Sequence, residues 1–358
     1  MSLHNGPSEK ASWLSGWLID GWAGHWEMVK DWLEISQLAS SSQEEKPEWQ
    51  IPQVPLPDPL KQSVLSIGNF DGVHLGHRDL FAYARGCAHP GQKVIAVTFD
   101  PHPRALLRPK DTGPPLLTLM RKVQKLKQNG VDQVIVFRID PAFLDIRAQD
   151  FFDGIIRGIL NPARLIEGNN FCFGRKREGT ISRLGELCEV SGIKLDIHPG
   201  LTDNDGWIST SRIRNLLIQG DVAQASKLLG EPHETEAEVI SGAQRGRTLG
   251  FPTANLAQPQ TLVPAIGVYA ARATLHDGTT HGAAVNIGPN PTFGEDAFKI
   301  EAHILDYSGD LYGKSLRLDW IERVRGPVAF SSIDGLKNQI QTDLSQIRAI
   351  LEKSQAKP

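Results

Sequence analysis

The chain has 358 residues, a formal net charge of −3 and three cysteines. This length predicts two domains with an appendage, and the nearly balanced charge argues against a nucleic-acid or membrane-surface protein. Cys87, Cys172 and Cys188 are odd in number and lack metal-site spacing, so they favour a reducing cytoplasm over a disulfide framework. No apolar run reaches the roughly 20 residues of a membrane span, and we expect no signal peptide.

Residues 1–58 differ in composition from the rest of the chain and hold six of its eight tryptophans. The first four tryptophans recur at near-helical spacing and predict an amphipathic helix over about residues 12–38. A Ser- and Pro-rich linker follows up to Pro59. Because tryptophan favours interfaces, the segment could contact a partner or a membrane surface. The mixed acidic and basic residues instead favour a helix that packs on the main body or an upstream stretch that is not well folded.

From about Leu60 the pattern alternates between short apolar strands and amphipathic helices. The strand-like runs are residues 64–67, 93–99, 133–137 and 164–167, and the helical patterns cover 75–87, 118–129, 148–160 and 181–191. Such alternation predicts a Rossmann-like parallel sheet that is covered by helices. Ligands of these folds bind at the carboxyl ends of the strands.

The most distinctive stretch, residues 66–77, follows the first of these strands. Its turn contains Gly68, Gly72, Gly76, His74 and His77. A strand that feeds a tight turn and a helix directs backbone N–H groups toward one point, which favours an anion such as phosphate. The histidines are three residues apart and share a helical face, so they could hold phosphate oxygens. Taken alone, they are equally compatible with a structural turn or with half of a zinc site.

Three further stretches follow predicted strands or open a helix, at residues 97–103, 167–175 and 208–214. They carry Asp100 and His102 in a proline turn, Asn170, Phe171 and Phe173 in a loop, and Ser209, Thr210, Ser211 and Arg214 at a helix start. The phenylalanines could stack on a flat ring, a hydroxyl could cap the helix, and the arginine could reach a phosphate. Taken singly, each stretch is better explained as a surface turn, core packing or a capped helix.

In this order, the four stretches resemble the prokaryotic bifunctional riboflavin kinase/FAD synthetases, which belong to the nucleotidylyltransferase superfamily. The motifs are Gly-Asn-Phe-Asp-Gly-Val-His-x-Gly-His, Thr-Phe-x-Pro-His-Pro, Gly-x-x-Phe-x-Phe-Gly and the Ile-Ser segment that ends at Arg214. The resemblance implies catalytic His74, His77 and Arg214, nucleotide-binding Gly68, Asn69, Phe70, Asp71, Gly72, Gly76, Asn170, Ser209 and Ser211, and flavin-binding Asp100, His102, Phe171 and Phe173.

This half departs from the family pattern at two places. Residues 169–170 are Asn-Asn where the family often has acidic residues, and Ser211 occupies the position of a usual threonine. Serine keeps the hydroxyl, so we expect the activity to be retained.

Beyond residues 230–236 the pattern changes to short β-prone runs that are separated by turn signals. These runs are residues 238–240, 268–275, 282–287, 299–305 and 315–321. They predict a small antiparallel barrel. A final helix should begin with Asp334 as its cap, because apolar residues recur at helical spacing from Leu336 to Leu351.

The chemistry of this half is concentrated in residues 246–255 and in a strand glutamate. Thr253 and Asn255 are two apart in an extended segment and point the same way, and their oxygens suit Mg²⁺ that substrate phosphates also bind. Glu301 alternates with apolar neighbours, which is compatible with an edge charge or with a buried base. Alone, a glycine-rich hairpin and an exposed glutamate would be the simpler explanation.

Together, these stretches resemble riboflavin kinase, with the further segments Gly267-Val268-Tyr269, Asn286-Ile287-Gly288 and Pro291-Thr292-Phe293. The resemblance then covers about residues 62–353. It implies Glu301 as base, Thr253 and Asn255 as Mg²⁺ ligands, Gly246 and Arg247 on ATP, and Asn286 and Thr292 on the flavin. Asn290 and residues 326–329 depart from the family pattern, so flavin affinity could differ.

We therefore predict an α/β adenylyltransferase domain at residues 59–232 and a riboflavin kinase barrel at 233–358, after the extension at 1–58. The substrates would be riboflavin, FMN and ATP, with Mg²⁺, in the cytoplasm, and a homo-oligomer is compatible with the sequence. Three alternatives stay open: a kinase with a decayed first domain, another nucleotidylyltransferase with an accessory barrel, and a non-enzymatic flavin-binding scaffold.

Overall fold

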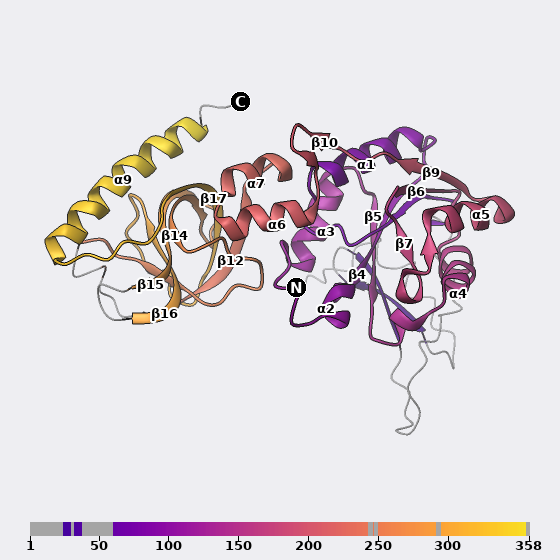
Figure 1. The fold of residues 1–358 in the computed structure, drawn as a ribbon, viewed down its shortest axis with the longest axis horizontal. Helices are drawn as coiled ribbons and strands as arrows, with labels where there is room; N and C mark the ends of the chain where they lie inside the picture. Colours follow the sequence, from indigo (N-terminus) through magenta and orange to yellow (C-terminus); the bar gives the residue numbers. More distant parts are fainter. Residues whose placement is uncertain are drawn as a thin grey trace, which may run out of the picture.

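The computed structural model describes residues 24–29, 32–37, 60–242, 246, 250–290 and 295–355. These residues form two bodies that lie side by side, an open sheet with helices and a barrel, and two helices lie between them (Figure 1). None of the described helices is both long and apolar enough to span a membrane.

The first body is built on a sheet with the strand order β1-β2-β5-β4-β3-β6-β9. Its parallel strands are β3 (Val64–Ile67), β4 (Val94–Asp100), β5 (Gln133–Arg138), β6 (Arg164–Gly168) and β9 (Lys194–His198). The parallel sheet expected from the alternating pattern is confirmed. Strand β9 was not predicted, because it lies at the sheet edge and its half-exposed side chains do not form an apolar run.

Helices cover both faces of this sheet, as its alternating side chains require. One face packs against α4 (Ala148–Asp150), the π-helix η3 (Phe151–Leu160) and α5 (Ile181–Ser191), with Leu65 and Phe152 in its core. The other face packs against α1 (Leu75–Cys87) and α3 (Leu119–Gln128), around Phe81. The helix expected over residues 148–160 is therefore a short α turn that continues as a π-helix.

The first body also contains smaller elements. They are α2 (Pro103–Leu107), η2 (Phe143–Asp145), η4 (Arg175–Arg177), and the two-residue strand pairs β7 (Cys172–Phe173) with β8 (Gly179–Thr180) and β10 (Thr202–Asp203) with β11 (Gly206–Trp207).

The N-terminal extension corrects one prediction. Residues expected in an amphipathic helix form the hairpin β1 (Gly24–Val29) and β2 (Trp32–Gln37), and β2 pairs in parallel with β5. Both segments also alternate with period two, so the helical spacing of the tryptophans was ambiguous. Pairing with the open edge of the sheet favours the strand. The rest of the expected helix and the linker up to Pro59 lie outside the described residues.

Two helices connect the bodies, α6 (Thr210–Gln219) and α7 (Val222–Leu229), each of which ends at a glycine with positive φ. Apolar side chains of α6 and α7 belong to the same core as the barrel interior, together with Leu116 from the first body. The backbone N–H of Leu262 donates to the Pro115 carbonyl oxygen at 2.8 Å. The two bodies are therefore packed together and share a core.

The second body is a closed barrel with the strand order β12-β13-β16-β15-β14-β17, as the sequence predicts. Its strands are β12 (His233–Ile240), β13 (Ala254–Leu256), β14 (Gly267–Thr274), β15 (Thr280–Asn290), β16 (Glu295–Ile304) and β17 (Ser315–Arg325). The interior holds Trp320 and Tyr269, and the Trp320 indole N–H donates to the Thr235 hydroxyl at 2.9 Å. All neighbouring strands are antiparallel.

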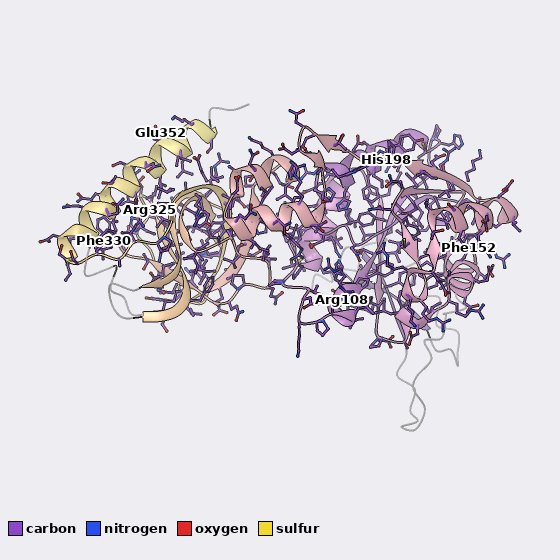
Figure 2. All side chains as sticks on the ribbon, in the orientation of Figure 1. Arg108, Phe152, His198, Arg325, Phe330 and Glu352 are labelled. Carbon is purple, nitrogen blue, oxygen red and sulfur yellow. The ribbon has the colours of Figure 1, made fainter. Side chains whose placement is uncertain are left out.

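The final helix α9 (Ile333–Gln355) lies against the outside of the barrel, where Ile347 and Leu351 are buried. Arg325 at the end of β17 forms an ion pair with Asp343 of α9 at 2.7 Å, beneath the helix in Figure 2. The helix was predicted, but its cap was not: the Ser332 hydroxyl oxygen accepts the Gly335 N–H at 3.1 Å.

Two candidate active sites

The histidine turn joins β3 to α1 at the carboxyl end of the sheet. The rings of His74 and His77 stack with their centroids 3.7 Å apart and 19° between their planes. Gly76 makes this packing feasible, because a Cβ atom there would lie 3.2 Å from the His74 ring and 3.3 Å from the Ile208 carbonyl oxygen. The expected shared face of the two histidines is confirmed, and the space at Gly76 admits a ring and a backbone carbonyl.

His74 is buried and His77 is half-buried with its Nδ1 atom shielded from solvent, and this determines their charge. Burial lowers the pKa of His74 to about 4, against the opposing field of Asp71, and it lowers the pKa of His77 well below its ordinary value. Among the described residues, neither Nδ1 atom has a hydrogen-bond partner, and the same holds for the Asn69 Oδ1 atom. The turn therefore presents neutral rings and an amide with unused hydrogen-bonding atoms.

The backbone of the same turn adopts unusual conformations. Phe70 has φ 47°, Gly72 has φ 84° and Val73 has φ 41°. For a β-branched residue such as valine this region is an outlier that costs of the order of 1–3 kcal/mol. The Arg78 Nε–H group donates to the Val73 carbonyl oxygen at 3.0 Å and holds the strained turn to α1.

Asp71 brings a distant segment to the turn. Its buried carboxylate accepts the Leu116 N–H at 2.8 Å and forms an ion pair with Arg214 of α6 at 2.7 Å. The Arg214 guanidinium also donates to the Pro114 carbonyl oxygen, and the Thr210 hydroxyl donates to the Asp71 carbonyl oxygen. The contacts that the structure gives the Asp71 side chain are thus with the protein, which supports a positioning role within the turn.

The remaining predicted residues of this half occupy the neighbouring strand ends. Asp100 forms an ion pair with Arg138, and the His102 Nδ1 atom accepts the Arg104 N–H at 3.0 Å at the start of α2. Burial lowers the pKa of His102 to about 4, with the field of Asp71 opposing it. The Asp100 and His102 side chains therefore also take part in the local structure of their turn.

The loop after β6 divides its predicted residues between core and surface. Phe173 is buried, and Phe171 stacks on it with ring centroids 5.7 Å apart, whereas Asn170 is exposed. The expectation that at least one phenylalanine belongs to the core is confirmed. At the start of α6 the Ser209 hydroxyl caps the helix through the Arg212 N–H, and Ser211 is exposed in the first turn.

Lys122 of α3 was not singled out from the sequence, yet it reaches this site. Its ammonium group donates to the Asn69 carbonyl oxygen at 3.3 Å and to the Thr98 hydroxyl at 3.1 Å. The signal was present, because Lys122 lies next to Val123 and one turn before Leu126 on the buried side of the helix.

The second candidate site lies on the outside of the barrel. Strand pairing places Asn255 of β13 opposite Glu301 of β16, and Glu301 opposite Asn286 of β15. Because Ile300 and Ala302 point into the core, the row of three polar residues faces outward. Opposed residues in an antiparallel pair have Cβ atoms about 5 Å apart, so the carboxylate is flanked by two amides.

Glycines bring the segment before β13 close to this row. A Cβ atom at Gly242 would lie 2.2 Å from the Asn255 amide nitrogen, and one at Gly246 would lie 3.1 Å from the Thr253 hydroxyl oxygen. Hydroxyl, amide and carboxylate oxygens are hard ligands, the kind that Mg²⁺ prefers. In the described part of the chain, no cluster of three or more His, Cys, Asp or Glu could hold a metal alone. Arg247 and Thr292 lie outside the described residues, and so does the Asn290 side chain.

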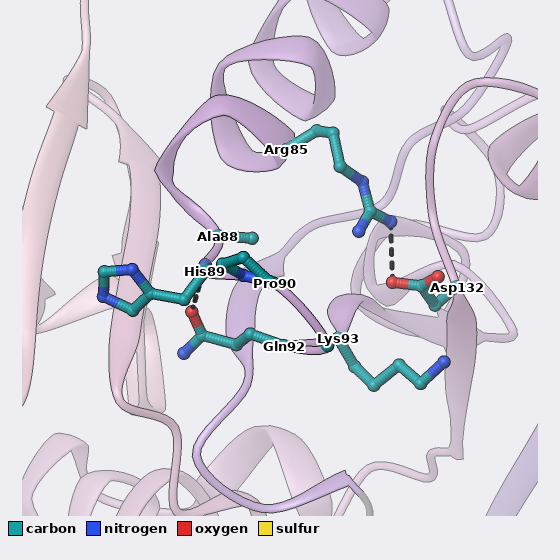
Figure 3. A pocket seen from close by; sticks show the side chains of 8 residues that line it. Arg85, Ala88, His89, Pro90, Gln92, Lys93 and Asp132 are labelled. Atoms are coloured by element: carbon teal, nitrogen blue, oxygen red, sulfur yellow. Dashed lines mark hydrogen bonds and ion pairs between the residues drawn. The ribbon is translucent and has the colours of Figure 1, made fainter.

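A cavity of about 360 Å³ lies elsewhere, near the N-terminal end of β4. Figure 3 shows its lining side chains, among which Arg85 and Asp132 form an ion pair at 2.6 Å. It is at the opposite end of the strands from the histidine turn. Open α/β sheets bind ligands at the carboxyl ends, so this cavity is not the candidate site.

A cluster of charged residues joins the two bodies beside the histidine turn. The Arg121 guanidinium binds both carboxylate oxygens of Glu234 on β12, at 2.6 and 2.7 Å. The buried Lys125 ammonium lies 3.3 Å from Glu234 and 3.0 Å from Glu231, which also pairs with Arg78. Arg78 thus connects the Val73 carbonyl to the start of the barrel.

Both halves of the chain are similar to known protein families. A riboflavin kinase family model matches residues 229–351, and an FAD synthetase family model matches residues 57–212. The bifunctional riboflavin kinase/FMN adenylyltransferase of Listeria monocytogenes is 34% identical over 81% of this chain and 93% of its own length, and that of Bacillus subtilis is 35% identical over 79% and 90%. A solved structure from Streptococcus pneumoniae, described as a macrolide-efflux protein, superposes with a TM-score of 0.73 at 32% identity over 80% of this chain and 94% of that one.

Proposed function

Because the chain belongs to the bifunctional riboflavin kinase/FMN adenylyltransferase family, we propose that it converts riboflavin to FMN and then FMN to FAD, with ATP as the second substrate of each step. The observation that carries the proposal is the row of Asn255, Glu301 and Asn286 in register on the barrel, separate from the stacked histidines of the sheet. Each matched segment thus contains a site of its own.

The barrel would catalyse phosphoryl transfer from ATP to the ribityl 5′-hydroxyl of riboflavin. Glu301 accepts the proton of that hydroxyl as the bond to phosphorus forms, and ADP leaves. Asn286 and Thr292 contact the flavin, while Gly246 and Arg247 approach ATP. Thr253 and Asn255 would hold Mg²⁺, which neutralises charge on the transferring phosphoryl group when bound.

The sheet domain would catalyse adenylyl transfer. An oxygen of the FMN phosphate attacks the α-phosphorus of ATP, the bond to the β-phosphate bridging oxygen breaks, and pyrophosphate leaves. The FMN phosphate is already ionised, so no general base is required. His74 and His77 donate hydrogen bonds from neutral rings to the phosphate oxygens, and Arg214, held by Asp71, lies beside them. His102 and Phe171 lie near the flavin.

We divide the chain at the start of β12, into an adenylyltransferase domain at residues 59–232 and a kinase domain at 233–358. The helices α6 and α7 support this division, because they precede the barrel and cap its end. A cytoplasmic location agrees with three cysteines that are all free.

The proposal is tested by incubating the purified chain with riboflavin, ATP and Mg²⁺ and separating the flavins over time. FMN should appear first and FAD should follow. Pyrophosphate release from ATP and FMN alone tests the second step by itself. FMN without FAD or pyrophosphate would indicate a kinase with an inactive first domain, and no reaction with any flavin would contradict the proposal altogether.

A further inference from the structure

The charges around the histidine turn leave one question, namely what balances the anions that meet there. The two histidines are neutral near pH 7 because burial lowers their pKa values. Arg214 is an ion-pair partner of Asp71 and also donates to the Pro114 carbonyl. In adenylyl transfer, the FMN phosphate must nevertheless approach the triphosphate of ATP, and both carry negative charge.

Lys122 lies between the two turns that these anions would approach. It contacts the Asn69 carbonyl on the histidine turn and the Thr98 hydroxyl on β4, two residues before Asp100. The first turn resembles the nucleotide-binding motif and the second leads into the proline turn assigned to the flavin. An ammonium group has three donors, and these contacts use two of them. In the residues that the structure describes, no carboxylate lies within ion-pair distance of Lys122, the nearest field being that of Asp71.

We propose that Lys122 is a catalytic residue of the adenylyl transfer, whose ammonium group binds phosphate oxygens where the FMN phosphate meets the α-phosphate of ATP. This inference rests on the proposed function of the sheet domain. The cation would reduce the repulsion between the two anions as they approach, and it would stabilise the charge that develops on the oxygens of the α-phosphate during in-line displacement.

The environment of Lys122 is that of a cation that is stabilised when it binds an anion. Burial lowers its pKa to about 8, and the field of Asp71 only partly offsets this effect. A cation that is costly to hold in the free protein gains most when a phosphate arrives. Lys127, about one and a half turns further along the same helix, makes no side-chain hydrogen bond or ion pair with the described residues and provides a matched control.

The test compares Lys122→Gln, Lys122→Arg and Lys127→Gln in two assays, FAD formation from FMN and ATP, and FMN formation from riboflavin and ATP. We expect Lys122→Gln to lower kcat/KM for FAD formation by about 100-fold, as loss of one charge-stabilising donor commonly does. FMN formation should be unchanged, which also shows that the protein is folded. Lys122→Arg should keep most of the activity, and Lys127→Gln should behave as the parent.

The pH profile of kcat/KM gives a readout that a structural role would not change. For the parent, FAD formation should decline as pH rises through about 8, because the free lysine loses its proton. The other groups that face Lys122 are His77 and His102, whose pKa values burial lowers below 6.5, and the ion pair of Asp71 with Arg214. Lys122→Arg should shift this decline to higher pH.

Two results would overturn the assignment: a Lys122→Gln variant as active as Lys127→Gln, or a Lys122→Arg variant with the decline of the parent. If Lys122→Gln does not fold, the profile of Lys122→Arg decides alone. A parent protein that forms no FAD from FMN and ATP would instead contradict the proposed function, so the two failures are distinguishable.

Discussion

His74 and His77 act as neutral rings because they stack on each other, His77 also contacts the Phe70 ring, and desolvation lowers both pKa values. A neutral imidazole donates one hydrogen bond and accepts another, so each ring can bind a phosphate oxygen only in the correct tautomer. The unused Nδ1 atoms are the atoms through which a ligand could select that tautomer.

Substitution of either histidine should therefore affect one reaction only. We expect His74→Ala and His77→Ala to slow FAD formation from FMN by about 100-fold, the usual cost of one oxyanion donor. FMN formation on the barrel should continue at the parental rate. Unchanged FAD synthesis in both variants would show that the turn is structural.

The same burial predicts a loss of stability in mild acid. The folded pKa of His74 is about 4 and its ordinary value is 6.5, so the unfolded chain binds the additional proton. The stabilisation is fully present above pH 6.5 and is lost as pH falls toward 4, and the loss at pH 5 amounts to about 2 kcal/mol for His74. Urea unfolding at pH 7 and pH 5 measures this, and His74→Gln should show a smaller difference between the two values. An equal difference would contradict the assigned burial.

Glu301 is the residue on which the kinase step depends. Glu301→Gln preserves the size of the side chain and much of its hydrogen bonding but cannot accept a proton. FMN formation should fall by about 10² to 10⁴-fold, the typical contribution of a general base. FAD formation from added FMN should remain at the parental rate. If neither reaction slows, Glu301 is only a charged residue on its strand and not the catalytic base.

At the scale of the elements, the ionic cluster between α3 and β12 holds the two bodies together. Burial raises the pKa of the Glu234 carboxyl group. The hydrogen bonds and charges of Arg121 and Lys125 together exceed this effect, so the pKa is lowered. Its carboxylate is mostly buried, as is the Lys125 ammonium, so removal of Glu234 leaves Arg121 without its carboxylate and the buried Lys125 with Glu231 alone.

Glu234→Gln should accordingly destabilise the protein by about 3–5 kcal/mol. The exposed pair of Arg183 and Glu186 offers a control, and Glu186→Gln should cost less than about 1 kcal/mol. Urea unfolding with a probe in each domain measures both effects. A loss for Glu234→Gln as small as that for the control would contradict the role of the cluster.

The regular elements were largely predictable, because buried parallel strands such as residues 64–67 read as apolar runs and amphipathic helices such as α3 carry a clear period. Edge strand β9 and the extension were not, since edge pairing depends on neighbours that are distant in sequence. The same reason limits how much of the two candidate sites could be predicted from the sequence. The motifs identified His74 and Glu301, but the alignment of Asn255 with Asn286 depends on barrel register, and Lys122 depends on how α3 packs.

For the whole molecule, the hairpin of the extension lies at the far edge of the sheet, beyond β5, whereas the histidine turn follows β3. Deletion of residues 1–58 should leave both activities nearly intact, because the site residues lie downstream. It should lower stability or solubility, because the β5 edge loses its partner. Activity assays and thermal unfolding of the truncated chain measure this. A truncated chain that is folded but inactive would show that the extension contributes to an active site.

The central claim is that one chain carries two separate sites linked by free FMN. The most direct test mixes two singly defective variants, Glu301→Gln and His77→Ala. It then measures FAD formation from riboflavin and ATP over time. Alone, the first should make little FMN and the second should stop at FMN. We predict that the mixture forms FAD, because FMN made by one molecule reaches the intact sheet domain of the other. A mixture that forms no more FAD than either variant, although both are folded, would contradict the claim.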